Sequence, residues 1–414
     1  MADNRFYDAL ETRDPAERQA AQWAALQAQI SHAAANSAYF GEILAGVTGA
    51  DIKSAADFAK LPVTRKSDLA ARQKAKPPFG GLEAVARAKL KHVFQSPGPI
   101  YEPDGYDRDH WRFARAMWAA GLRPGDLVLN CFSYHLTPAG MLVESAAHAI
   151  GCPVIPGGVG NTELQLQAVN DLKPDAYGGT PSFLRILLQK GREMGLDVSS
   201  LKKALVGGEA LPPSLRKEIN DLGCFVLQNY GTADLGLVAY ESPAMEGMIL
   251  DEGVWVEIVR PGTGDPVAPG EVGEVVVTTL TNKEYPLIRF ATGDLSAVLA
   301  GTSPCGRTNT RIKGWMGRAD QTTKVKGMFV TPGQIAQVVA RHAEIAKARL
   351  EVTSTNNTDA MVLKIELRGS GADITAAIAE TLQAVCKVRG SVEAVGAGSL
   401  PNDGKVIADL RTYQ

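Results

Sequence analysis

The chain has 414 residues, of which 45% are hydrophobic and 21% are charged, and its formal net charge is −2. This composition is that of a globular protein with two or three domains, and the near-neutral charge argues against a nucleic-acid or anionic-membrane surface. No apolar run approaches the roughly 18 residues that span a bilayer, and the N-terminus lacks the apolar core of a signal peptide. We therefore expect a cytoplasmic protein that has no membrane and no nucleic-acid partner.

The first half of the chain alternates between helical and strand patterns. A helix is predicted over about residues 14–44. From Val93 to about Tyr230, short apolar strands alternate with amphipathic helices, which indicates a parallel sheet with helices on both faces. The predicted helices cover residues 107–122, 139–150, 163–172, 181–190 and 213–222. The predicted strands cover residues 127–132, 152–155, 176–179, 203–206 and 224–228.

The pattern changes after Tyr240. Two β-rich segments, 248–258 and 273–279, predict a β-rich subdomain over about residues 241–316, packed beside the sheet. Shorter elements then follow up to the C-terminus. They are a hairpin at 322–330, a helix at 333–341, strands at 349–354 and 361–368, and a helix at 374–385.

The segment Gly317-Arg318-Ala319-Asp320 lies between the large and the small region, and it is short, charged and bounded by glycine. We interpret residues 317–320 as a hinge between a large N-terminal domain, residues 1–316, and a small mobile C-terminal lid domain, residues 321–414. The expected fold class is α/β. The large domain would hold parallel sheets covered by helices plus the β-rich subdomain, and the small domain would be α+β.

The cysteines are odd in number and widely separated, and no Cys-x-x-Cys pair occurs. This pattern predicts buried free thiols and favours neither a zinc site nor a disulfide framework. The five are Cys131, Cys152, Cys224, Cys305 and Cys386.

Two glycine-containing segments follow predicted strands, namely Gly207-Gly208-Glu209 and Tyr230-Gly231-Thr232-Ala233-Asp234. Ligands bind at the carboxyl ends of parallel strands, and glycine lets the main chain approach a ligand closely. Tyr230 is suited to stacking on a planar base, and Asp234 to binding a hard cation such as Mg²⁺. Plain turns with solvated side chains are the alternative explanation.

Two further candidates lie later in the chain. Asp294 ends a Thr-Gly-Asp segment, and a carboxylate in such a place can accept both hydroxyls of a ribose. Lys405 follows Gly404 close to the C-terminus, but Val406 stands where a Walker A motif has Ser or Thr. If the tail folds over an active site, the Lys405 ammonium would stabilise developing phosphate charge.

Taken in order, these segments resemble the adenylate-forming superfamily of acyl-CoA synthetases, and most closely its phenylacetate-CoA ligase branch. The shared order is Gly-Gly-Glu, Tyr-Gly-x-x-Asp, Thr-Gly-Asp, Gly-Arg-x-Asp and a terminal Gly-Lys. Three more segments, Leu61–Leu69, Gly179–Ser182 and Cys305–Thr308, are similar to signatures of that branch. The resemblance runs from about Leu61 to Lys405.

The resemblance implies an AMP-forming acid–thiol ligase with two half-reactions. A carboxylate attacks the α-phosphate of ATP, giving an acyl-adenylate and pyrophosphate. The small domain then rotates, and the thiol of coenzyme A displaces AMP. ATP, Mg²⁺ and coenzyme A would be the cofactors, and the branch implies a homodimer.

By position, the resemblance also gives the motif residues roles. Asp234, which replaces the family's usual Glu, would bind Mg²⁺, and Lys405 would assist adenylation. Asp320 would be the hinge, and Gly327 would lie near the coenzyme A tunnel. The nucleotide-binding residues would be Gly208, Glu209, Tyr230, Gly231, Asp294, Arg307 and Arg318.

The family's phosphate loop is rich in Ser, Thr and Gly and carries a lysine, but residues 94–103 match it only at Ser96 and Gly98. Pro97 and Pro99 in this segment have no N–H to offer a phosphate, and Glu102 has the wrong charge. The β- and γ-phosphates are therefore poorly supported unless another basic residue compensates.

The segment Asn130–Leu136 falls where this branch places aromatic pocket residues. Phe132 and Tyr134 would frame a flat ring of the substrate. His135 would orient a polar group, with a purely structural histidine as the alternative. Gly158 would form a wall that lets the substrate approach the main chain.

The leading hypothesis is an AMP-forming aryl- or acyl-CoA ligase that activates a carboxylic acid, most simply an aromatic one. One alternative is an adenylating enzyme with another acceptor, such as a carrier-protein thiol or an amine. The other is a family member that binds nucleotide or acyl-CoA without efficient adenylation. A Lys or Arg near Ser96 and Gly98 would argue against this last alternative.

Overall fold

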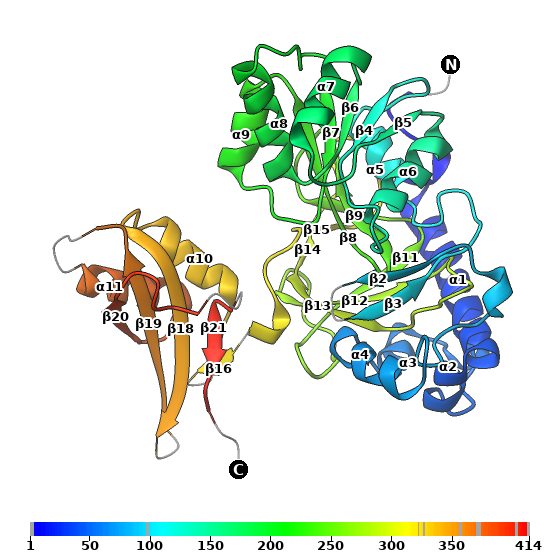
Figure 1. The fold of residues 1–414 in the computed structure, drawn as a ribbon. Helices are drawn as coiled ribbons and strands as arrows, with labels where there is room; N and C mark the ends of the chain where they lie inside the picture. The colour runs from blue at the N-terminus through cyan, green and yellow to red at the C-terminus, as the bar shows by residue number, and fades with distance from the viewer. Residues whose placement is uncertain are drawn as a thin grey trace. The chain divides into compact units, whose positions relative to one another are not determined.

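The structure, a computed structural model, describes residues 4–96, 99–321, 323–325, 328–355, 358–369, 374–401 and 405–411. The chain divides into two compact units (Figure 1). The first unit holds residues 1–260, 264–292 and 297–315. The second holds residues 261–263, 293–296 and 316–414.

Within the described residues, the largest sheet has nine strands and belongs to the first unit. Its strands from β5 to β8 pair in parallel, and those from β8 to β14 pair antiparallel. In spatial order they are β14 (Val298–Leu299), β15 (Arg311–Ile312), β10 (Met248–Leu250), β9 (Gly236–Glu241), β8 (Phe225–Thr232), β7 (Lys203–Val206), β6 (Ala176–Gly179), β4 (Val128–Asn130) and β5 (Val154–Pro156).

Helices cover both faces of the parallel part (Figure 1). Successive strand residues point to opposite faces, so Leu205 packs into one core while Ala204 and Val206 pack into the other. The core around Leu205 also contains residues of α5 (Ala114–Ala119) and α6 (Ala139–Ile150). The opposite core contains residues of α7 (Thr162–Leu172), α8 (Pro181–Glu193) and α9 (Pro213–Asp221). The strands therefore have two apolar faces, as their uninterrupted apolar runs predict.

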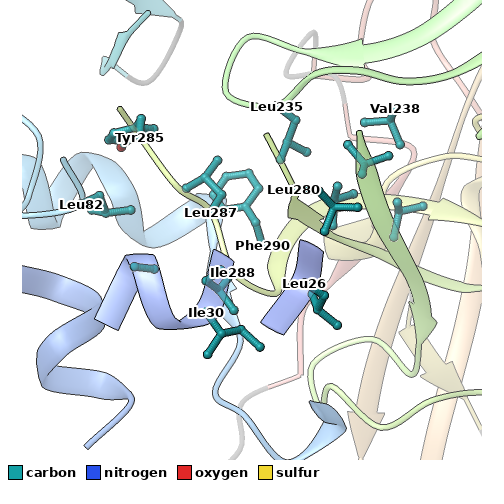
Figure 2. Close-up of a cluster of buried hydrophobic side chains, with 14 of the residues drawn as sticks. Leu26, Ile30, Leu82, Leu235, Val238, Leu280, Tyr285, Leu287, Ile288 and Phe290 are labelled. Carbon is teal, nitrogen blue, oxygen red and sulfur yellow. The ribbon is translucent and has the colours of Figure 1, made fainter. Parts of the chain in front are cut away.

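A four-stranded sheet packs against the N-terminal helices and shares a core with them. Figure 2 shows part of this core, where Leu26 and Ile30 lie among Leu280, Leu287 and Phe290. In spatial order the strands are β1 (Thr64–Arg65), β13 (Phe290–Ser296), β12 (Gly273–Thr279) and β11 (Val254–Val259). The helices are α1 (Pro15–Asn36), α2 (Ala38–Ile43), α3 (Ala55–Ala59) and α4 (Lys66–Ala75), with 3₁₀ turns η1 (Ala9–Thr12), η2 (Gly49–Asp51) and η3 (Arg87–Lys89).

The second unit is a small sheet with two helices and its own apolar core. Strands β18 and β19 pair antiparallel, and β21 and β20 flank them in parallel. Helix α10 begins with a capping box in which Thr331 and Gln334 exchange hydrogen bonds. The elements are η4 (Ala319–Gln321), β16 (Thr323–Val325), β17 (Met328–Val330), α10 (Pro332–Ala340), β18 (Ile345–Thr355), β19 (Thr358–Leu367), α11 (Thr375–Cys386), β20 (Ser391–Val395) and β21 (Ile407–Asp409).

The α/β class, the alternation and most element bounds are confirmed, with two corrections. The helix expected at 107–122 is reduced to α5, because Asp109 and Arg112 have φ values of 52° and 67°, which no right-handed helix contains. The β-rich stretch also divides, since β10, β14 and β15 extend the large sheet and only β11 to β13 join the smaller one. No helix in the described part of the chain is both long and apolar enough to cross a membrane.

Candidate active site

Four of the segments singled out in the sequence lie at the carboxyl ends of β4, β6, β7 and β8, which are neighbours in the sheet. Gly207 donates its N–H to the oxygen of Gly179 over 3.2 Å, so the segments after β7 and β6 are joined. Gly208 has φ +78°, and a Cβ there would lie 3.6 Å from the ring of Phe132. The structure thus brings a predicted nucleotide-binding glycine against a predicted pocket residue.

Glu209 connects two of these segments. Its carboxylate accepts hydrogen bonds from Ser182 N at 3.0 Å and from Ser182 Oγ at 2.5 Å, at the start of α8. A carboxylate in this position also complements the positive end of the helix dipole. Glu209 therefore holds the Gly-Gly-Glu turn against the Thr-Pro-Ser turn.

A cluster of three ionisable side chains, Lys66, Asp234 and Glu102, lies where the phosphate loop was predicted. Strands β2 (Val93–Ser96) and β3 (Ile100–Pro103) pair antiparallel, and Ser96 Oγ donates to Glu102 Oε1 over 2.5 Å. Asp234, which follows β8, forms an ion pair with Lys66 at the start of α4. Glu102 is fully buried and Asp234 is almost so.

The two carboxyl groups of this cluster face each other. Burial, and then the negative charge of Asp234, raise the pKa of Glu102 to about 9, although Ser96 and Lys66 act in the opposite direction. Glu102 therefore carries a proton at neutral pH, through which it hydrogen bonds to Asp234. Glu102 Oε2 and Asp234 Oδ1 accept no other hydrogen bond within the described residues. Two buried carboxyl oxygens in contact need a proton or a cation between them.

Such a pair fits a Mg²⁺ ion, which proteins bind through one or two carboxylates while waters and substrate phosphates complete the shell. Asp234 and Glu102 are the residues that would hold the metal. Lys66 would remain beside it as a fixed positive charge, because it is paired with the other oxygen of Asp234, Oδ2.

The predicted substrate pocket has a hydrogen-bonded wall. Tyr134 Oη accepts from Asn130 Nδ2 over 2.8 Å and donates to Glu144 Oε2 over 2.7 Å. Burial and the Glu144 carboxylate raise the pKa of Tyr134, so the phenol stays neutral. Gly158 has φ +61°, and a Cβ there would come within 4.0 Å of the Tyr134 ring. The side chain of His135 is exposed.

Tyr230 and Gly231 lie in β8, where the register against β9 shifts by one residue. Tyr230 is buried in the core, and its hydroxyl donates to Thr292 Oγ1 over 3.3 Å. A Cβ at Gly231 would lie 2.7 Å from the oxygen of Gly236. The Tyr-Gly pair therefore shapes the bulge that turns the chain toward Asp234.

In the second unit, the structure brings together Asp294 and Arg318. The Arg318 guanidinium donates to Asp294 Oδ1 over 3.1 Å, and the main chains of these residues form an antiparallel bridge. Gly293 permits this contact, since a Cβ there would lie 2.7 Å from Arg318 Nη2. Lys405 is exposed just before β21, and the next residue, Val406, donates its N–H to Gln321 Oε1 over 2.8 Å.

Arg307 lies elsewhere than predicted. Its guanidinium is buried and donates to Glu11 Oε1 over 2.5 Å, and it also lies against the rings of Phe6 and Tyr240. The expected contact with the ribose and phosphate is therefore not supported, because this cation already has a buried carboxylate partner.

Three predicted positions remain without a full description. Gly98 and Gly327 lie outside the described residues. For Asp320 the structure describes the main chain, which belongs to η4.

Lys66 and Glu102 were not predicted to be site residues. Lys66 belongs to the Leu61–Leu69 signature, so its presence in a branch-specific segment was the available signal. Glu102 was taken for a residue of the wrong charge, because its partner Asp234 is 132 positions later and the contact depends on the fold.

Comparison with known proteins gives a consistent result. The family model "AMP-binding enzyme" matches residues 108–282. The phenylacetate-coenzyme A ligase of Aromatoleum evansii is 32% identical over 85% of this chain and 82% of its own length. That of Escherichia coli (strain K12) is 31% identical over 99% of both chains. An open conformation of 2-hydroxyisobutyryl-CoA ligase in complex with 2-HIB-AMP and CoA has a TM-score of 0.86 at 27% identity, covering 99% of this chain and 95% of its own.

Proposed function

The chain belongs to the adenylate-forming superfamily, in its phenylacetate-CoA ligase branch, and we propose that its substrate is an aromatic carboxylic acid. It is an AMP-forming acid–thiol ligase that uses ATP and coenzyme A. In the first step a carboxylate oxygen bonds to the α-phosphorus of ATP and pyrophosphate leaves. In the second step the sulfur of coenzyme A bonds to the acyl carbon and AMP leaves.

The observation that carries the proposal for this site is the Lys66–Asp234–Glu102 cluster. A partly buried cation and two buried carboxyl groups beside the carboxyl end of β8 form a preorganised place for phosphate charge and its counter-ion. Lys66 supplies the basic group that the proline-containing loop lacks. This weakens the alternative of a family member that does not adenylate.

Mg²⁺ would neutralise phosphate oxygens when it is bound. Asp234 and Glu102 would hold it, and Glu102 would have to release its proton to do so. Ser96 would then keep Glu102 in position through its hydroxyl, which already donates to Oε1. In this arrangement Ser96 and Glu102 of β2 and β3 would contribute to metal binding. A usual phosphate loop, in contrast, binds the phosphates through main-chain N–H groups.

The aromatic ring would lie against Phe132, beside Gly208 and the Tyr134 wall. Aryl pockets in proteins are mostly apolar with a few placed polar groups, and the rings of Phe132 and Tyr134 would supply the apolar surface here. A small hydroxy acid is the second candidate, because the Asn130–Tyr134–Glu144 hydrogen bonds place polar atoms beside the same pocket.

We further propose that the second unit completes the site. Asp294, with Arg318, would contact the nucleotide, and residues 317–320 would act as the hinge. Gly317 has φ +119°, a conformation open to glycine, so the chain can turn there. Lys405 would approach the α-phosphate in the adenylating arrangement and leave it before thioester formation.

ATP–pyrophosphate exchange and acyl-CoA formation, measured with phenylacetate, benzoate, 2-hydroxyisobutyrate and acetate, test the proposal. We expect kcat/KM for an aromatic acid to exceed that for acetate by at least 100-fold. A preference for 2-hydroxyisobutyrate would establish the second candidate. Exchange with an acid that then gives no acyl-CoA would point to a different acceptor.

A further inference from the structure

One buried side chain of helix α7 holds the main chain that follows β5. Gln165 is 4% exposed, and its Nε2 donates to the oxygen of Gly157 over 3.1 Å and to that of Gly158 over 2.7 Å. Carbonyl oxygens only accept hydrogen bonds, so the amide must present its NH₂ group to them. Two successive residues of one turn therefore depend on the same side chain.

The other end of this amide has no partner. Gln165 Oε1 is buried and accepts no hydrogen bond from the residues that the structure describes. The neighbouring Leu166 and Val169 of α7 are fully buried in an apolar core. A buried acceptor that lacks a donor is unfavourable, so an apolar side chain would suit position 165 better if it only filled space. The glutamine is explained by its two donors.

The turn needs support because its backbone is unusually free. Gly158 and Asn161 have φ values of 61° and 49°, and glycine has many accessible conformations from which contacts must select one. Gly158 N donates to the oxygen of Asn130 over 3.0 Å, and a Cβ at Gly157 would lie 3.3 Å from that same oxygen. The turn is thus fixed between the end of β4 on one side and Gln165 on the other.

Asn130 links the turn to the proposed substrate pocket. Its side chain donates to Tyr134 Oη over 2.8 Å and accepts from Phe132 N over 3.2 Å. Gly158 also lies beside the Tyr134 ring, since a Cβ there would be 4.0 Å from it. A displacement of the turn would therefore change the space between its main chain and the two aromatic residues.

We propose that Gln165 is a positioning residue that fixes one wall of the acyl pocket and thereby determines which acids the enzyme accepts. It acts through the main chain of Gly157 and Gly158, without contact to the acid. The inference rests on the proposed function, in which Gly158 and Tyr134 border the acid. Without the two donors, both carbonyl groups of the turn would be free to reorient, and the wall would lose the shape that favours one acid.

Two variants, Gln165→Met and Gln165→Glu, test this role in ATP–pyrophosphate exchange with phenylacetate, benzoate, 2-hydroxyisobutyrate and acetate. Methionine keeps the length of the side chain, and ionised glutamate keeps its oxygen acceptors, but neither can donate to the turn. For the acid that the wild type prefers, we expect KM to rise at least about 10-fold in both variants, because small displacements of positioning groups have large effects. The preference for that acid over the poorest one, as a ratio of kcat/KM values, should fall by a similar factor. KM for ATP should stay within about 2-fold of the wild type.

Gln167→Met is the matched control, because Gln167 is exposed on the same helix, and we expect it to leave every parameter unchanged. Methionine suits the apolar core, so Gln165→Met should fold even if Gln165→Glu does not. An unchanged KM for the acid in Gln165→Met would overturn the proposal, since volume alone would then suffice at this position. Equal increases in KM for the acid and for ATP would also overturn it, because they would indicate a general loosening of the site. The wild type's choice of acid tests the proposed function separately, since the variants are compared on whichever acid is preferred.

Discussion

The single positive charge of Lys66 interacts with two carboxyl groups, those of Asp234 and Glu102. It pairs with Asp234 directly, and its charge also acts on Glu102, which keeps a proton because it is fully buried. Breaking a buried ion pair from one side leaves an uncompensated charge, which is strongly destabilising. Substitutions in this cluster are therefore expected to change both the stability of the fold and the chemistry proposed for the site.

We predict that Lys66→Met lowers the rate of ATP–pyrophosphate exchange at least 100-fold, since it removes a fixed charge that stabilises the phosphates. Exchange should be measured well below the melting temperature, which the substitution will also lower. Lys74→Met is the matched control, because Lys74 lies exposed on the same helix, α4. A variant that loses stability but keeps its exchange rate would reduce Lys66 to a structural residue.

The raised pKa of Glu102 predicts a pH-dependent stability. Between its usual pKa in the unfolded chain and about 9 in the native protein, the native state holds a proton that the unfolded state has released. Stability therefore falls as the pH rises through this window. Glu102→Gln keeps an acceptor for Ser96 and an amide donor for Asp234 but cannot ionise.

We expect the wild type to lose about 2 to 4 kcal/mol of unfolding free energy, relative to Glu102→Gln, between pH 5 and pH 8. Urea denaturation with a metal chelator present provides the measurement. Glu193→Gln, an exposed change at the end of α8, should follow the wild type. If the curves of wild type and Glu102→Gln run parallel, the buried proton is not there.

At the scale of elements, the bulge between β8 and β9 positions Asp234. The register shifts between Tyr230 and Gly231, and the main chain of Gly236 lies against Gly231 with no room for a methyl group. Main-chain atoms of a paired strand move less easily than the end of a side chain. The glycine in the Tyr-Gly pair is thus explained by packing between two strands.

Gly231→Ala is predicted to lower the free energy of unfolding by about 2 kcal/mol, because the added Cβ would lie 2.7 Å from a main-chain oxygen. It should also lower pyrophosphate exchange by displacing Asp234. Gly396→Ala is the control, as a Cβ there meets no atom within 4 Å. Chemical denaturation and exchange assays give both readouts, and an unperturbed Gly231→Ala would show that the bulge can relax.

At the scale of the whole molecule, the proposed reaction needs one small unit to serve two half-reactions. We predict that Lys405→Ala lowers ATP–pyrophosphate exchange about 100-fold and leaves thioester formation from a synthetic acyl-adenylate within a few-fold of the wild type. Lys405 is exposed, so its removal should not unfold the second unit. Arg389→Ala, an exposed change in the same unit, is the control. Equal losses in both half-reactions would contradict a role in adenylation alone.

Sequence patterns predicted the elements well where one local rule decides them. The apolar runs of β6 and β7 and the amphipathic repeat of α6 gave bounds that the structure confirms. The helical pattern failed around Asp109 and Arg112, because both residues have positive φ values. Long-range hydrogen bonds hold Arg112 there, since its guanidinium donates to Asp251 Oδ1 over 2.9 Å and to the oxygen of Leu237 over 3.2 Å.

By itself, the sequence determined the family, the α/β class and the segments that surround the candidate site, because motif order and hydrophobic period are properties of the chain. Only the tertiary structure decided which charges meet. In the folded chain Arg307 pairs with Glu11, and Lys66 pairs with Asp234. Glu102, which has the wrong charge for a phosphate loop, is a buried acid that holds a proton. Charge pairing depends on distance in space and on the exclusion of water, and neither is set by distance along the chain.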